Sequence, residues 1–209
     1  MKLIKCDRIN DLGVLVVKEL RMNYHNENIV NKARRGLGFM KRQAKQFNDP
    51  YVTKALYSAI VRPYLEYCSV AWNPYTVTHV NLIESVQKQF LLFSLRGLGW
   101  NDYFALPHYG DRLQLIDMEP LHVRRSRFDG VFMFKLMNGL IDSPYLLSTV
   151  SYNASPYDTR NRNVLLQADH STNYGYNEAM NRLTRLYNDN TETFRNSHSI
   201  ISFKNNFIL

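Results

Sequence analysis

The residues best suited to chemistry in this sequence are cations spaced along one predicted helix, residues 28–47. Glu27 is the only acid close enough to offset them. Six cations lie within the helix: Lys32, Arg34, Arg35, Lys41, Arg42 and Lys45. A row of lysines and arginines binds a nucleic-acid backbone without regard to base sequence, because each phosphate that it neutralises releases condensed counterions. We therefore predict these six side chains as phosphate contacts, and the alternative for each is a solvated surface charge.

An apolar stripe predicts the helix that positions these cations. Its members recur every three or four residues, which places them on one side of an α-helix. They are Ile29, Ala33, Leu37, Met40, Ala44 and Phe47. Gly36 and Gly38 interrupt the helix at about 1 kcal/mol each. Gly38 falls inside the basic face, where a missing side chain would let a phosphate backbone approach closely. A kink at the glycines, or two short helices, fits the pattern equally well.

The positive charge is concentrated in the first half of the chain. The 209 residues include 26 Lys+Arg and 18 Asp+Glu, a net charge of +8. Residues 1–100 hold 15 basic and 7 acidic residues, whereas residues 101–209 hold 11 of each. We therefore predict a basic region, 1–100, and a charge-neutral region, 101–209. One-sided positive charge attracts nucleic acid or an anionic membrane, although a basic face that only keeps the protein in solution is the plainer alternative.

The rest of the chain predicts a mainly α fold. Apolar periodicity and capping residues indicate helices over residues 50–63, 64–72, 78–95 and 120–138, with shorter ones near 112–116, 144 and 177–187 and a weak one at the end of the chain. Residues 151–172 are expected to be irregular. A buried strand over residues 12–17 is the exception, because no neighbouring segment offers it a partner. An unpaired strand exposes backbone donors and acceptors, so we expect an orphan strand at the start of a chain that begins within a larger fold.

The sequence contains no recognisable catalytic or metal-binding pattern. No two aspartates are adjacent, although a two-metal site needs clustered carboxylates. Asp117 and Glu119 are interpreted as charges at a helix start. Cysteines and histidines do not fall at zinc spacing, and His25, His108 and His122 are interpreted as loop and capping residues. We predict no catalytic residue, metal ligand or cofactor in this chain.

The cysteines and the short apolar runs of the sequence predict the cellular compartment of the protein. Cys6 and Cys68 cannot form a disulfide framework, and the N-terminal residues lack the apolar core of a signal peptide. No apolar run approaches the ~18 residues of a membrane-spanning helix. We therefore expect an intracellular protein, cytoplasmic or nuclear, with no membrane partner.

Aromatic residues alternate with cations just after the basic helix. They are Tyr51, Tyr57, Tyr64, Tyr67 and Trp72, beside Lys54 and Arg62. Base-stacking platforms combine these residue types. Core packing uses them more often, so both interpretations stay open.

The most specific motif spans residues 56–74 and reads LYSAIVRPYLEYCSVAWNP. It is similar, at nearly every position, to the signature LY-x-S-L-V-R-P-x-LEY-x-S-x-V-W-x-P found just after the catalytic palm in reverse transcriptases of LINE-type (non-LTR) retrotransposons, especially the Jockey-like group. Further similar segments extend the resemblance over almost the whole chain. They include Asp11-Leu12-Gly13-Val14, Ile83-Glu84-Ser85-Val86-Gln87-Lys88 and Asn138-Gly139-Leu140-Ile141-Asp142-Ser143-Pro144.

The resemblance implies a thumb-like helical bundle that grips a template–primer duplex, either RNA·DNA or DNA. It also implies that the Mg²⁺-binding aspartates of the parent RNA-directed DNA polymerase lie upstream, in a palm that this chain lacks, so that the missing palm and fingers are partners. The sequence departs from the family pattern at three positions. Val17 replaces a usual aspartate, and Gln89 and Leu92 replace usual basic residues.

Two other interpretations stay open. The chain is a non-functional retrotransposon relic if its apolar faces lack their partners, in which case it should aggregate. It is a helical protein–protein interaction module if the neutral region 101–209 carries the function, although no anchor motif there supports this.

Overall fold

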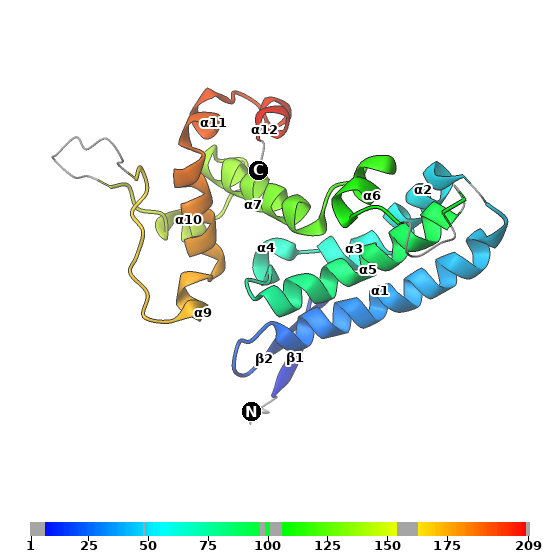
Figure 1. Cartoon of the computed structure of the whole chain (residues 1–209). Helices are drawn as coiled ribbons and strands as arrows, with labels where there is room; N and C mark the ends of the chain where they lie inside the picture. Colours follow the sequence, from blue (N-terminus) through cyan, green and yellow to red (C-terminus); the bar gives the residue numbers. More distant parts are fainter. Residues whose placement is uncertain (1–6, 48, 97–98, 101–105, 154–162, 208–209) are drawn as a thin grey trace. The chain divides into compact units, whose positions relative to one another are not determined.

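The computed structural model describes residues 7–47, 49–96, 99–100, 106–153 and 163–207. This part of the chain is mainly helical, as predicted, and it also contains one small two-stranded sheet (Figure 1). Contacts divide it into a first unit that ends at Arg124 and a second that starts at Arg125. This division is based on packing contacts. The predicted division into a basic region, 1–100, and a charge-neutral region, 101–209, is based on charge and stays a prediction.

The first unit contains two strands and seven helices among its described residues, and an eighth helix begins in it. They are β1 (Arg8–Asp11), β2 (Val14–Val17), α1 (Asn23–Gln43), a 3₁₀ turn (Ala44–Gln46), α2 (Pro50–Ile60), α3 (Arg62–Glu66), α4 (Ser69–Trp72), α5 (Val77–Arg96), α6 (Tyr109–Leu115) and the start of α7 (Leu121–Met137). The second unit contains the rest of α7 and five further helices. These are α8 (Pro144–Ser148), α9 (Asn173–Tyr176), α10 (Ala179–Asp189), α11 (Thr191–Asn196) and α12 (Ile200–Asn206).

The prediction of an orphan strand is wrong. β2 pairs with β1 in an antiparallel hairpin whose register joins Arg8 to Val17 and Asp11 to Val14. Leu12 and Gly13, predicted as strand, form the turn with φ values of 45° and 91°. Two positive φ values are typical of the tight hairpin turn that matches strand twist. The partner strand escaped prediction because β1 is mostly polar and faces solvent along its length, and because leucine rarely adopts positive φ.

His25 joins the hairpin to the helices. It lies in the first turn of α1 and is buried, not in a loop. Its Nδ1 accepts a hydrogen bond from the backbone N–H of Leu15 at 3.0 Å, and its ring lies 5.2 Å from the ring of Trp72. The neutral ring is therefore the form that fits this site, because a protonated Nδ1 cannot accept a hydrogen bond.

The predicted apolar stripe forms the core of the first unit. Its members Ile29, Ala33, Leu37, Met40 and Ala44 are all buried. Phe47 is the exception: it is half exposed, because the chain leaves the helix through the 3₁₀ turn and is extended at Phe47. α1 runs without a break through Gly36 and Gly38, so the alternative of two short helices is wrong.

The segment that carries the family signature forms α2, α3 and α4, which pack beside α1 (Figure 1). The Asp49 carboxylate caps α2 by accepting from the Tyr51 N–H at 2.8 Å. The helix predicted over 64–72 divides at Cys68, whose φ is +54°. Tyr57 is fully buried and stacks on Phe90 of α5 at 4.2 Å. The signature residues therefore build the support on which α1 rests.

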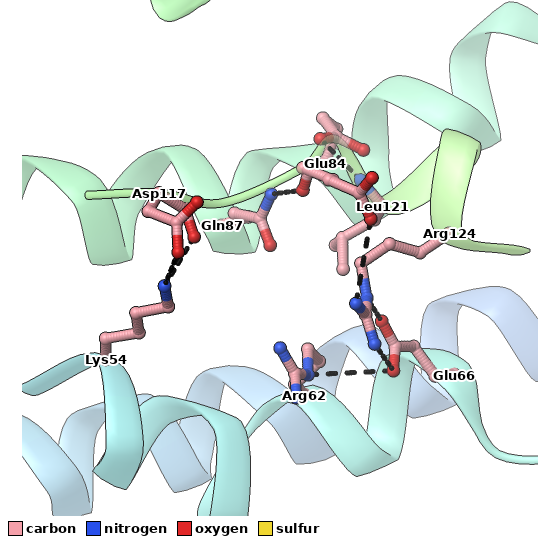
Figure 2. Close-up of polar contacts among 9 residues, drawn as sticks. Lys54, Arg62, Glu66, Glu84, Gln87, Asp117, Leu121 and Arg124 are labelled. Carbon is pink, nitrogen blue, oxygen red and sulfur yellow. Dashed lines mark hydrogen bonds and ion pairs between the residues drawn. The ribbon is translucent and has the colours of Figure 1, made fainter. Parts of the chain in front are cut away.

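Buried polar groups of α5 hold the segment that leads into α7, as Figure 2 shows. The Glu84 carboxylate accepts from the Tyr109 hydroxyl and from the Leu121 N–H, the latter at 3.0 Å. The Gln87 amide accepts from the Tyr57 hydroxyl at 3.2 Å and donates to the Glu119 carbonyl at 2.9 Å. These hydrogen bonds form where water is largely excluded, which fixes the packing geometry, although the second Glu84 carboxylate oxygen is buried without a hydrogen-bond partner in the described structure.

An aromatic cluster forms the core of the second unit. Phe203 of α12 stacks on Phe134 of α7 at 4.7 Å and on Phe207 at 4.8 Å. Gly130 of α7 accepts the Phe207 ring so closely that a Cβ there would lie 2.7 Å from it. Of residues 151–172, the described part is irregular as predicted, with one antiparallel bridge between Tyr152 and Leu165.

His25 should make the first unit less stable in mild acid. Burial, and then Lys32, lower the pKa of His25 from 6.5 to about 4. Between these pH values the unfolded chain binds the proton more readily than the folded one, so the stabilisation present above pH 6.5 is lost as the pH falls toward 4. One pKa unit corresponds to about 1.4 kcal/mol. We expect the free energy of urea unfolding, followed by tryptophan fluorescence, to fall by about 2 kcal/mol from pH 7 to pH 5.

His25→Gln removes the titration and should flatten this pH dependence. His122→Gln, at an exposed position of α7, is the matched control and should retain it. Equal pH dependence in the wild type and in His25→Gln would contradict the assignment.

Candidate nucleic-acid interface

Most of the predicted phosphate contacts are exposed on α1. Arg34, Arg35, Arg42 and Lys45 are exposed, and Lys32 and Lys41 are half-buried. Among the described residues, no carboxylate forms an ion pair with any of these six cations. The buried stripe fixes one side of α1, so its opposite side presents charges that no neighbouring acid neutralises.

The basic surface continues from α1 onto α5. The two helices lie side by side (Figure 1). Arg34 donates to the Ser85 hydroxyl at 3.3 Å, and the Lys41 ammonium lies 5.8 Å from the centre of the Phe93 ring. These two contacts advance along both helices in the same direction, so α1 and α5 are parallel. We call the basic face the group formed by Arg34, Arg35, Gly38, Lys41 and Arg42 of α1, Lys45 of the 3₁₀ turn and Arg96 of α5.

Arg96 is a member that sequence reasoning missed. It is exposed at the end of α5 and close enough to Lys41 to lower the pKa of its ammonium, although burial lowers it more. Two cations held together in this way repel each other, and an anion placed between them would relieve the repulsion. No local pattern pointed to Arg96, because its role depends on how two distant helices pack.

The structure separates Lys32 from this group. Lys32 lies one turn before Gly36, whose Cβ position is 3.4 Å from the Ile60 carbonyl oxygen, and thus on the flank of α1 that meets α2 and α3. Lys32 acts electrostatically on His25 on this same flank. Arg35 is exposed and lies two helical turns before Arg42, so it belongs to the same side of α1 as Arg42.

Gly38 lies on the outer side of α1, within the basic face. A Cβ there would meet only the end of the Arg42 side chain, at 3.7 Å. Packing therefore does not require glycine at this position, in contrast to Gly36, whose flank contacts another helix.

The aromatic residues divide between core and surface. Tyr57 and Trp72 are buried, and the Trp72 indole donates to the Tyr67 carbonyl at 2.7 Å. These two rings belong to the core. Three other rings are exposed: Tyr51, Tyr64 and Tyr67.

The cations beside these rings have carboxylate partners. Lys54 pairs with Asp117 at 3.0 Å, and Arg62 pairs with Glu66 at 3.6 Å (Figure 2). Arg124 also contacts Glu66, with a second hydrogen bond of 3.2 Å. Asp117 is therefore an ion-pair partner and not a helix-start charge.

Within the described ranges, no three His, Cys, Asp or Glu side chains are grouped so that they could hold a metal ion. No helix in the same ranges is long and apolar enough to cross a membrane. Comparisons with protein-family models, with curated proteins and with solved structures found no match to this chain.

Gly38→Ala should make the protein more stable. Alanine is favoured over glycine inside a helix by about 1 kcal/mol, and the added methyl group meets only a flexible side chain end. We expect the free energy of urea unfolding to rise by up to about 1 kcal/mol.

Gly130→Ala is the matched contrast within α7. Its Cβ would collide with the Phe207 ring, and overpacking of this kind costs about 1–3 kcal/mol, so stability should fall. A loss of stability in Gly38→Ala would contradict an open position there.

Proposed function

We propose that the chain binds the sugar–phosphate backbone of a nucleic-acid duplex through its basic face. In this proposal it is the thumb-like, post-palm region of an RNA-directed DNA polymerase of a non-LTR retrotransposon. The observation that carries the proposal is the row of exposed cations on one side of α1, without described acidic partners, around the side-chain-free Gly38. Such a surface gains affinity by releasing counterions from phosphates.

The packing of α1 supports a gripping role. Grip requires cations held in a fixed geometry, because free lysine and arginine side chains lose rotamer entropy on binding. Arg34 is tied to Ser85, and Lys41 lies against Phe93. Both cations are thus oriented before a duplex arrives.

The resemblance supports the assignment to a polymerase. Its most specific segment forms α2–α4, and buried residues of that segment, Tyr57, Val61, Leu65 and Trp72, pack in the core beneath α1. The hairpin also offers exposed apolar residues, Leu12 at 85% and Ile9 at 58%, which a palm would cover in this proposal. Nucleotide addition with Mg²⁺ is assigned to that palm, and this chain supplies grip and orientation.

Binding to a duplex should be strongly salt-dependent. We expect fluorescence anisotropy with a labelled RNA·DNA hybrid and with the same DNA duplex to show a steep fall of log K with log salt, corresponding to roughly four or more phosphate contacts. Replacing Arg34, Arg42 and Lys45 by Gln should weaken binding more than about tenfold near 0.1 M salt and reduce the slope by about 3.

The control replaces Lys18, Arg21 and Lys204 by Gln, which removes the same charge from exposed positions outside the basic face. Its affinity should change far less. Equal losses in both triple variants would show that net charge alone, and not the basic face, binds the duplex. Soluble, helical protein that binds neither duplex would overturn the proposal and favour the interaction module, whereas aggregation would favour the relic.

Gln89→Arg should strengthen binding. Gln89 is exposed and lies one turn from both Ser85 and Phe93, the two residues of α5 that contact cations of α1. Arginine there would extend the basic face at a position where the resembling family usually has a basic residue. We expect higher affinity and a salt slope steeper by about 1.

Gln114→Arg adds the same charge at an exposed position of α6 and is the control for Gln89→Arg. Its effect should be smaller at every salt concentration. If both variants gain equally, Gln89 does not lie beside the bound backbone.

A further inference from the structure

The second unit contains a polar pocket that the nucleic-acid proposal does not use. Its volume is about 360 Å³. Aromatic side chains and hydrogen-bonding groups line it together, and those that matter here are Asn138, Tyr152, Tyr187, Arg195, Ser197 and His198. No carboxylate is among its lining residues.

Hydrogen bonds fix the shape of the pocket. The Asn188 side chain accepts from the Leu165 N–H at 2.9 Å and donates to the Leu165 carbonyl at 3.0 Å. Leu165 in turn forms a backbone bridge to Tyr152, so the backbone at Tyr152 is anchored to α10. At the turn from α10 to α11, the Thr191 hydroxyl lies within 3.2 Å of the Tyr187 carbonyl. The walls are thus built from two anchored segments.

Aromatic rings form the apolar wall. Tyr187 packs against Phe194 at 4.6 Å, and Phe194 packs against Phe203 of the core cluster at 4.8 Å. Tyr152 stands at the mouth and is two-thirds exposed. A planar ring entering the pocket would therefore find the exposed Tyr152 ring to stack on.

Hydrogen-bond donors gather at the other wall. The Ser197 hydroxyl is buried without a partner in the described structure, and an unsatisfied buried hydroxyl is costly. Arg195 and His198 are exposed on either side of Ser197 in the sequence and line the same pocket. A guanidinium, a hydroxyl and an imidazole in a pocket whose lining includes no carboxylate suit a phosphate group.

We propose that this pocket binds a nucleotide, with its phosphate held by Arg195 and Ser197 and its base stacked on Tyr152. The chemistry is shared by a free mononucleotide and by the phosphorylated end of a strand. The proposal does not depend on the basic face, because every residue in it belongs to the second unit.

Calorimetric titration with 5′-AMP, adenosine and inorganic phosphate tests the site. We expect AMP to bind with a Kd below about 1 mM, and adenosine and phosphate to bind at least about tenfold more weakly, because each meets only one wall of the pocket. Equal affinity for AMP and adenosine, or no binding of AMP or of a phosphorylated strand, would overturn the proposal.

A short 5′-phosphorylated single strand and its 5′-hydroxyl counterpart distinguish the two sources. They are titrated into the full chain carrying Gln at Arg34, Arg42 and Lys45, so that the basic face does not contribute. A preference for the phosphorylated strand over AMP assigns the site to strand ends, and the reverse assigns it to free nucleotides. Failure of the basic face as a duplex contact would leave this result unaffected.

Two variants test the residues. Arg195→Gln should weaken binding at least about tenfold, whereas Lys204→Gln, which removes an exposed charge from α12 outside the pocket, should not. Ser197→Ala should weaken binding without lowering stability, because it removes a buried hydroxyl that lacks a partner. Wild-type affinity in Arg195→Gln, or equal losses in Lys204→Gln, would contradict the assignment.

Discussion

Burial of the apolar stripe of α1 is the interaction on which the first unit depends. Four of its side chains, Ile29, Ala33, Leu37 and Met40, belong to the core that α1 forms with α2, α3 and α5. Large apolar side chains contribute roughly 1.5–3 kcal/mol each when buried. The opposite side of the same helix carries cations that repel one another. Exposed repulsions are weak and screened by salt, so core packing outweighs them. The helix therefore holds a cluster of like charges in place without acidic neighbours.

α5 connects this surface to the rest of the first unit. One side of it contacts α1 through Ser85 and Phe93. Its Glu84 and Gln87, on another side, hold Tyr109, Glu119 and Leu121. Breaking one partner of such a buried polar set leaves the other unsatisfied, which costs more than the hydrogen bond itself contributes. The position of the basic face thus depends on polar groups that lie on the far side of α5 from the cations.

Local sequence patterns predicted features that are determined within a single helix. They missed features that arise only where two distant segments of the chain pack together. Periodicity correctly placed the stripe of α1 and the helix that became α5. It failed at Phe47, where the helix tightens into a 3₁₀ turn, and at the hairpin, where polar β1 and Leu12 at positive φ resemble no common hairpin signal. Lys54 looked like a free cation beside tyrosines because its partner Asp117 is 63 residues away. Arg96 was missed for the same reason, since only tertiary packing brings it to Lys41.

The two proposed sites differ in the kind of recognition that their chemistry allows. Cations that contact phosphates position a duplex but do not read its bases, and preference for RNA over DNA requires contacts with the 2′-hydroxyl. The basic face consists almost entirely of long cationic side chains and therefore provides affinity without selectivity. The pocket of the second unit combines an exposed ring with an unpartnered hydroxyl and donors at fixed positions. Geometry of this kind distinguishes one ligand from another because a poorly matched ligand leaves buried polar groups unsatisfied. In a chain that has both, binding strength would arise mainly from α1 and chemical discrimination from the neutral second unit.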